Sequence, residues 1–187
     1  MTVVSNTSPL NYLTLVGLER LLPTLFGRVI IPLAVQEELK SPGAPVEVRD
    51  LLDRSRGWLE AMNAPSVSDP ILAGLDPGEK EAIGLAVSMG ADLILLDEAR
   101  GRRAAAEHLG LTVTGTLGVL DRAARAGLID ATDAVDRLRK TSFRASPKLY
   151  QLLLEPATKP ATKPATTRHK NEPKTGSRSM EQEEGSD

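Results

Sequence analysis

Short runs of branched aliphatic residues alternate with helix-like segments along residues 1–155, and this alternation limits the fold more than any other feature. Strands are expected at 3–4, 28–31, 58–62, 92–96 and 112–115, of which DLILL at 92–96 is the clearest. Strands that alternate with helices in this way form a parallel sheet with helices on both faces. The sequence therefore predicts an α/β fold built on a central parallel sheet.

The segments between the strands have helical patterns. Ser8 is expected to cap a helix that begins at Pro9, because hydroxyl side chains cap helices and proline fits the first helical position. Further helices are expected at 18–26, 33–40, 46–56, 79–90, 98–110, 116–127, 131–140 and 146–154.

The composition changes at Pro156, where the sequence begins to repeat PATK and contains almost no apolar residue. Such a segment cannot bury enough apolar surface to offset its chain entropy. We therefore expect one domain at 1–155 and a disordered low-complexity tail at 156–187.

Several classes of protein and of site do not fit the chain. It contains no cysteine and two histidines, so disulfides, thiolate sites and histidine-built metal sites are excluded or implausible. No apolar run approaches the ~20 residues of a membrane-spanning helix, and no export signal is indicated. A cytoplasmic protein is expected, and any metal ion would have to bind to oxygen ligands.

Polar residues follow two of the expected strands. Asn6 comes after the first strand and Asp97 after DLILL, while Glu38 and Glu79 lie on the helices at 33–40 and 79–90. Ligands of open parallel sheets bind beyond the carboxyl ends of the strands. If the strands are neighbours, these side chains converge, and a hard divalent cation such as Mg²⁺ or Mn²⁺ relieves the repulsion among the carboxylates. Metal-assisted hydrolysis of a phosphodiester is the chemistry that fits such a cluster.

Each of these residues also has a purely structural interpretation. Glu79 lies three positions after Asp76, which is the spacing of a capping box. Glu38 can belong to a solvated helix face, Asp97 can cap the helix that follows it, and Asn6 can form a turn.

The motifs VVSNTSPL, VIIPLAVQEEL and the segment at 75–129 together closely resemble a prokaryotic branch of the PIN-domain superfamily, over residues 2–154. The resemblance implies a PIN-like three-layer sandwich, in which helices flank a central parallel sheet. It further implies a Mg²⁺- or Mn²⁺-dependent ribonuclease of the type II toxin–antitoxin class. Such toxins act on RNA, are inhibited by a small antitoxin protein encoded nearby, and often form homodimers.

The resemblance also assigns the site residues. It places the four acidic positions of the superfamily at Asn6, Glu38, Glu79 and Asp97, of which the three acids would be catalytic and all four would hold the metal. Thr7 and Ser8 match the hydroxyl residues beside the first position. This chain departs from the wider pattern at Asn6, where most active members carry Asp. The amide keeps an oxygen for the metal but removes a negative charge.

Neighbouring charged residues complete the prediction. Glu98 is a supporting residue. The candidates for binding the RNA backbone are Arg100, Arg102 and Arg103. The alternative interpretation of these arginines is that they form a solvated helix face. Two other functions stay open: a catalytically weakened module that binds RNA or a partner protein without cleaving, and a DNA-processing nuclease. Asn6 favours the weakened module, the three retained acids argue against it, and a small antitoxin-like neighbouring gene would favour the toxin.

Overall fold

The computed structural model describes residues 1–55, 57–66 and 69–155; the tail predicted at 156–187 lies outside the described residues. A five-stranded sheet has the order β3-β2-β1-β4-β5. All neighbouring strands are parallel. The strands are β1 (Val3–Ser5), β2 (Val29–Pro32), β3 (Leu59–Met62), β4 (Leu93–Leu95) and β5 (Val113–Thr114). The predicted α/β class and parallel sheet are confirmed.

The order in which successive strands are added to the sheet reverses beside β1. The chain passes from β1 outward to β2 and β3, then returns to the other side of β1 as β4 and continues to β5. Val3 accordingly pairs with Val29 on one side and with Leu93 on the other. Ligand sites in open parallel sheets form at such a switch point, beyond the carboxyl ends of the strands. In this chain that point lies between Asn6 and Asp97.

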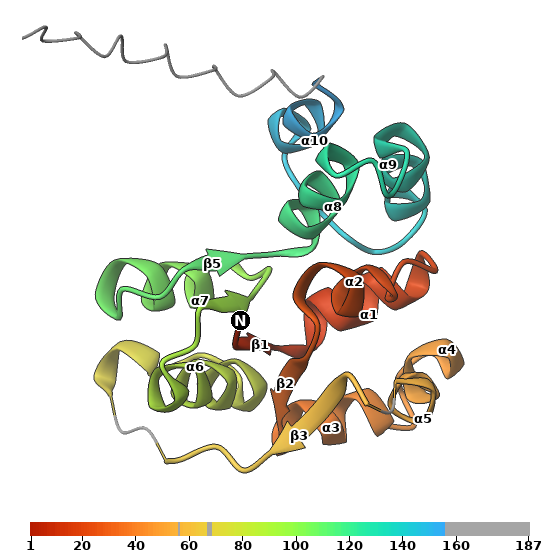
Figure 1. The fold of residues 1–187 in the computed structure, drawn as a ribbon. Helices are drawn as coiled ribbons and strands as arrows, with labels where there is room; N and C mark the ends of the chain where they lie inside the picture. Colours follow the sequence, from red (N-terminus) through yellow and green to blue (C-terminus); the bar gives the residue numbers. More distant parts are fainter. Residues whose placement is uncertain (56, 67–68, 156–187) are drawn as a thin grey trace, which may run out of the picture. The chain divides into compact units, whose positions relative to one another are not determined.

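Successive strand residues face opposite sides of the sheet and enter two separate hydrophobic clusters. Val3 and Leu95 belong to a cluster formed with α1, α2 and α8, whereas Val4 and Ile94 belong to a cluster formed with α6. In Figure 1, α6 and α7 lie on one side of the strands and α1 and α2 on the other. The sheet is thus the middle layer of three, and its inner strands β1, β2 and β4 are apolar and buried on both faces.

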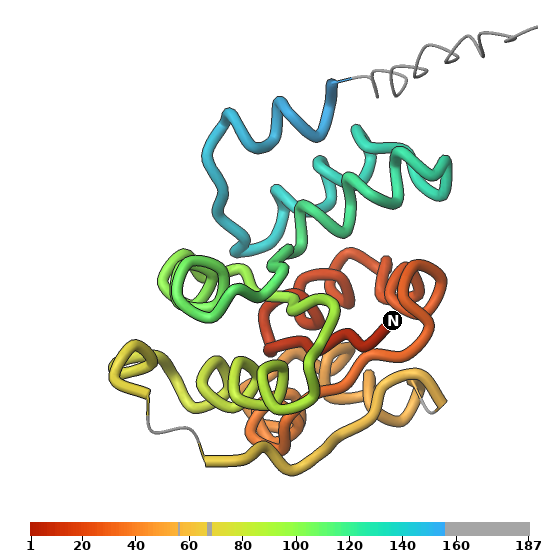
Figure 2. The backbone as a smooth tube through the Cα atoms, turned by 60° about the vertical axis from the view of Figure 1, so that its left-hand side comes forward, coloured from red at the N-terminus to blue at the C-terminus, as the bar shows by residue number. Residues whose placement is uncertain are grey.

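The helices have the following bounds. They are α1 (Thr7–Leu15), α2 (Leu21–Phe26), α3 (Leu33–Lys40), α4 (Val46–Arg49), α5 (Leu51–Arg54), the 3₁₀ turn η1 (Pro70–Leu72), α6 (Pro77–Met89), α7 (Ala99–Arg103), the π-helical turn η2 (Ala104–His108), α8 (Thr116–Arg125), α9 (Ala131–Arg139) and α10 (Pro147–Leu154). The last three helices lie together at one end of the described domain (Figure 2).

The predicted start of the first helix is wrong. Asn6 occupies the N-cap position without a side-chain capping bond, and α1 begins at Thr7. Ser8 is therefore already helical, and Pro9 is the third helical residue. Proline is tolerated there because the first backbone N–H groups of a helix have no intrahelical acceptor.

Two other predicted helices are interrupted. The helix expected at 46–56 is divided at Asp50, whose ψ of −8° breaks the regular helical geometry between α4 and α5. The helix expected at 98–110 changes to a π-helical turn from Ala104, and Ala104 and Ala105 are both buried there. The helix expected at 18–26 begins only at Leu21.

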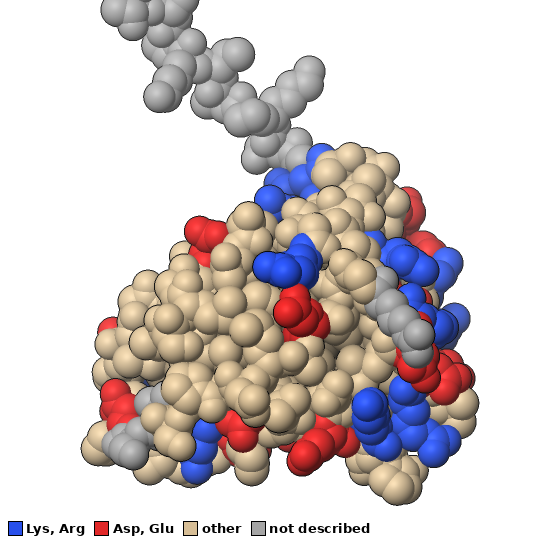
Figure 3. Space-filling view, turned by 60° about the horizontal axis from the view of Figure 1, so that its bottom comes forward, with Lys and Arg blue, Asp and Glu red and all other residues tan. Residues whose placement is uncertain are grey.

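The surface of the described residues carries both signs of charge. On the face drawn in Figure 3, basic and acidic side chains are interspersed and most of the centre is uncharged. Within the described part of the chain, no helix is long and apolar enough to cross a membrane.

Candidate active site

Asn6 lies directly beyond β1, in the centre of the sheet. Its backbone N–H donates to the Leu95 carbonyl (3.1 Å), which holds Asn6 beside the end of β4. The side chain is 4% exposed, and its Oδ1 has no hydrogen-bond partner among the described residues. A buried acceptor without a donor is costly, so this oxygen is ready to accept a bond from a ligand or to bind a cation.

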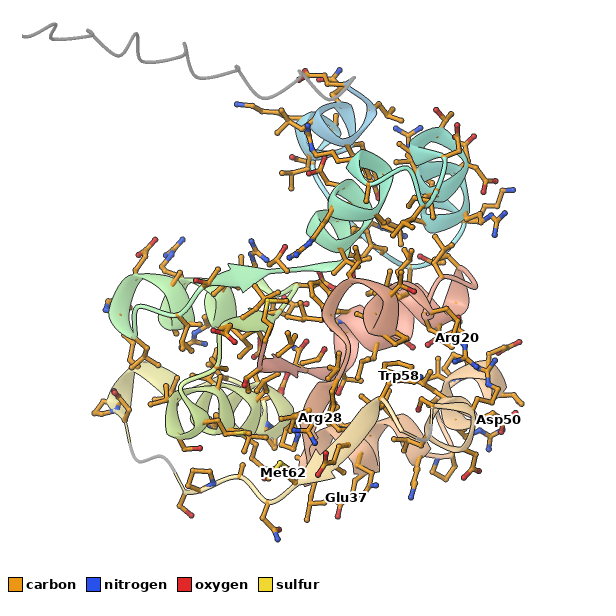
Figure 4. The ribbon with its side chains drawn as sticks, in the orientation of Figure 1. Arg20, Arg28, Glu37, Asp50, Trp58 and Met62 are labelled. Atoms are coloured by element: carbon orange, nitrogen blue, oxygen red, sulfur yellow. The ribbon has the colours of Figure 1, made fainter. Side chains whose placement is uncertain are left out.

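Glu38 reaches the same edge of the sheet from α3. The Thr7 hydroxyl donates a hydrogen bond to Glu38 Oε2. Glu38 Oε1 lies against Gly78, where a Cβ would be 2.8 Å from that oxygen. Glu38 is therefore placed between the first residue of α1 and the start of α6. Glu38 and the adjacent Glu37 are both exposed, and Glu37 lies on the outer side of the helix (Figure 4).

Glu79 at the start of α6 has two roles at once. It forms the capping box with Asp76: the Asp76 N–H donates to Glu79 Oε2 (3.3 Å), and the Glu79 N–H donates to Asp76 Oδ1 (2.7 Å). Its other oxygen, Oε1, is buried and has no hydrogen-bond partner in the described part of the chain. A Cβ at Gly101 would lie 2.6 Å from Oε1. The cap therefore fixes the side chain while one oxygen stays available.

Asp97 lies just beyond β4, the strand that pairs with β1, and both of its oxygens accept hydrogen bonds. The Thr116 N–H donates to Oδ1 (2.7 Å) and the Thr116 hydroxyl to Oδ2 (2.6 Å). Asp97 is not the cap of α7, because that position is held by Glu98, which makes no side-chain capping bond. Arg102 Nη1 donates to the Leu96 carbonyl (2.7 Å), beside Asp97.

Burial raises the pKa of two of these carboxyl groups. For Glu79, burial is the largest cause, and the charges of Asp76 and Glu98 raise the pKa further. For Asp97, burial outweighs the hydrogen bonds from Thr116, which lower the pKa. Both carboxylates therefore lack sufficient stabilisation of their negative charge, and a cation beside them would supply it.

The predicted site residues form two groups at the same edge of the sheet. We call Asn6, Glu38 and Glu79 the α6 group, and Asp97, Thr116 and Arg102 the β5 group. Among the residues that the structure describes, no three His, Cys, Asp or Glu side chains lie close enough together to hold a metal ion. The buried oxygens without donors fit a hard divalent cation in their chemistry.

The predicted RNA-binding arginines differ in their contacts. Arg100 donates to the carbonyls of Ala73 (2.9 Å) and Gly74 (3.2 Å), so it joins α7 to the loop before α6. Arg102 is half-buried beside Asp97, and Arg103 is exposed. Arg102 thus lies nearest to the site, while Arg100 also has a structural role.

Sequence reasoning missed the small residues that contact the carboxylates. Gly78, Gly101 and Gly115 lie against Glu38, Glu79 and Asp97 respectively, and a Cβ at Gly115 would also be 2.8 Å from the Leu96 carbonyl oxygen. Thr116, which holds Asp97, was also missed. The signal for Thr116 was its place directly after the strand expected at 112–115, at the edge where Asn6 and Asp97 were predicted.

Comparison with known proteins gives one match. Residues 2–159 match a family described as a PIN domain. No curated protein and no solved structure matches the chain.

Proposed function

Because this chain belongs to the PIN-domain family, whose members are generally nucleases, we propose that it is a divalent-metal-dependent endoribonuclease of the type II toxin class. The observation that carries the proposal is the pair of buried oxygens without hydrogen-bond donors, Asn6 Oδ1 and Glu79 Oε1. They lie at the same edge of the sheet as the Asp97 carboxylate. An oxygen-rich, partly charged crevice of this kind suits phosphodiester hydrolysis.

Mg²⁺ or Mn²⁺ would be held by Asn6, Glu38, Glu79 and Asp97. When bound, the ion would activate water and screen the charge of the phosphate. Thr7 orients Glu38 through its hydroxyl, and Thr116 orients Asp97 through two hydrogen bonds. These partners fix the carboxylates before the substrate arrives, as outer-shell partners of metal ligands generally do.

The nucleophile is proposed to be water. The chain contains no cysteine, and His108 lies at the end of η2 and is exposed. Arg102 lies beside Asp97, where its guanidinium is placed to contact a phosphate.

The test is cleavage of a broad panel of RNAs by the purified full-length protein in Mn²⁺, without any partner protein. We expect cleavage, and we expect Asp97→Asn to reduce its rate by at least about 100-fold. The matched control is Asp121→Asn, which removes the carboxylate of a surface ion pair with Arg125 on α8 (2.8 Å) and should leave the rate unchanged. An intact RNA panel, or equal rates for the two variants, would contradict the proposal.

The second candidate is a module that binds RNA or a partner protein without cleaving. Asn6 favours it, because the amide removes one negative charge from the site. In that case Asn6→Asp would create cleavage that the wild type lacks.

The toxin assignment carries proposals about partners and location. We propose a small antitoxin encoded beside the gene, a homodimer and a cytoplasmic location. Co-expression with the product of the neighbouring reading frame tests the first: copurification and loss of RNA cleavage are expected.

A further inference from the structure

A hollow of about 300 Å³ opens directly beside Asp97. Its size is at the lower end of the range for small-molecule sites. Apolar side chains from three segments line it: Leu117 at the start of α8, Phe143 in the loop before α10, and Leu149 on α10. Phe143 is held in place by an edge-to-face contact with Tyr12, with ring centroids 4.9 Å apart. The hollow is therefore a partly rigid apolar recess at the edge of the proposed catalytic crevice.

Two glycines lie on the side of the recess next to Asp97. Gly115 and Gly118 both line it. A Cβ at Gly115 would collide with Asp97 Oδ1, and a Cβ at Gly118 would collide with the Thr114 hydroxyl. The two glycines therefore allow Asp97 and Thr114 to pack closely against the backbone on this side of the recess.

Positive charge borders the recess. Arg102 and Arg144 both line it, and each is anchored through Nη1 to backbone carbonyls: Arg102 to Leu96 (2.7 Å), and Arg144 to Phe143 (3.0 Å) and Thr141 (3.3 Å). A guanidinium has five N–H donors, so an arginine anchored in this way still has donors for a phosphate. An apolar recess with arginines at its border matches a nucleotide, whose base is flat and whose phosphate is negative.

A second hollow, of about 440 Å³, continues past the recess. The two hollows share Asp97, Arg102 and Leu149, and the second is also lined by Arg103. Asp97 thus lies where the two hollows meet. A strand that passes from one hollow to the other would bring the phosphate between two nucleotides close to Asp97.

We propose that the recess of Leu117, Phe143 and Leu149 binds an unpaired nucleobase of the RNA strand, next to the phosphate that is cut. This rests on the proposed function and assigns the base beside the cut phosphate to a recess formed by α8, α10 and the loop before α10. A base within a duplex is stacked and paired, and it cannot enter a recess of this kind. Apolar and stacking contacts with bases make a protein bind an unpaired strand more tightly than a ribose-phosphate chain without bases.

The experiment measures binding without divalent metal, so that it does not depend on cleavage. The probes are fluorescein-labelled hexamers of adenylate, cytidylate and uridylate, an all-abasic ribose-phosphate hexamer of the same charge, and a blunt RNA duplex. We expect the full-length protein to bind at least one base-containing hexamer about fivefold or more tightly than the abasic hexamer and the duplex. Equal binding of intact and abasic hexamers would overturn the proposal, and it is also the result expected if the recess receives a polypeptide side chain.

A matched pair of variants on α10 locates the effect. Leu149 lines the recess and Leu152 does not, although the two are similarly exposed (49% and 45%). Leu149→Ala should reduce the preference for the intact hexamer to less than about twofold, and Leu152→Ala should keep it. Equal effects of the two substitutions would overturn the proposal. Its failure differs from a failure of the proposed function, which would appear as an uncut RNA panel in Mn²⁺ whatever the hexamers show.

Discussion

The α6 group and the β5 group lie at the same edge of the sheet, but their side-chain oxygens differ in whether they accept hydrogen bonds. In the α6 group, Asn6 Oδ1 and Glu79 Oε1 are buried without hydrogen-bond donors among the described residues. In the β5 group, both oxygens of Asp97 accept hydrogen bonds from Thr116. The α6 group therefore has unused capacity to bind a cation, whereas the β5 group is already oriented. We propose that the two groups contribute different things to one site: coordination capacity from one, and a fixed carboxylate from the other.

The largest effect within this comparison is expected from Thr116→Val, which removes the hydroxyl donor of the β5 group and keeps the shape of the side chain. Asp97 Oδ2 then loses its bond, and the pKa of Asp97 rises further because this hydrogen bond holds it down. We expect Mn²⁺ affinity and RNA cleavage to fall by about 10- to 100-fold, as for other outer-shell partners. Thr116→Ser keeps the donor and should restore both. Wild-type values for Thr116→Val would show that Asp97 needs no such orientation.

A smaller effect is expected from Glu38→Gln in the α6 group. The substitution removes one negative charge from the proposed ligand set and keeps an oxygen that the Thr7 hydroxyl can bond. Mn²⁺ affinity should fall by about tenfold, because the affinity of oxygen sites depends on their ligand charge. Glu37→Gln is the matched control, since Glu37 is the neighbouring residue on α3 and is exposed as Glu38 is. If calorimetry finds the same loss of Mn²⁺ affinity for both variants, Glu38 is not a ligand of the metal.

The smallest effect is expected on stability, from Glu79→Gln in metal-free buffer. The pKa of Glu79 is raised in the folded state, so its ionisation costs stability as the pH rises above the ordinary carboxyl value of about 4.3. The full cost is present above the raised pKa and is absent below the ordinary one. The glutamine side chain of the variant retains the cap without a charge. Urea unfolding should therefore show similar stabilities near pH 4 and a more stable variant near pH 8.

Addition of Mn²⁺ at pH 8 sharpens this result. The ion should stabilise the wild type more than Glu79→Gln. A variant that is less stable than the wild type at every pH would instead mean that Glu79 acts only as a cap.

The sequence allowed the centre of the sheet to be predicted because β1, β2 and β4 are buried on both faces, so that they appear as short apolar runs. The edge that carries the proposed site was also predictable, since Asn6 and Asp97 directly follow strands that proved to be neighbours. The capping-box interpretation of Glu79 was confirmed by the structure, and it did not exclude an available second oxygen.

The missed features depend on tertiary geometry. The contact of Gly101 with Glu79 joins α7 to α6, and the hydrogen bonds of Thr116 with Asp97 span nineteen positions of the chain. No local pattern encodes such approaches. The wrong cap at Ser8 has a local cause: Asn6 fits the N-cap position equally well, and proline is tolerated anywhere in a first turn.

The most direct test of the proposed metal site is calorimetric Mn²⁺ binding by the full-length protein, comparing the wild type with Asp97→Asn and Asn6→Asp. We expect the wild type to bind Mn²⁺, Asp97→Asn to abolish or strongly weaken binding, and Asn6→Asp to strengthen it by adding a charged ligand. A wild type that binds no Mn²⁺ until Asn6→Asp supplies the fourth carboxylate would contradict a working metal site, and so would wild-type binding that Asp97→Asn leaves unchanged.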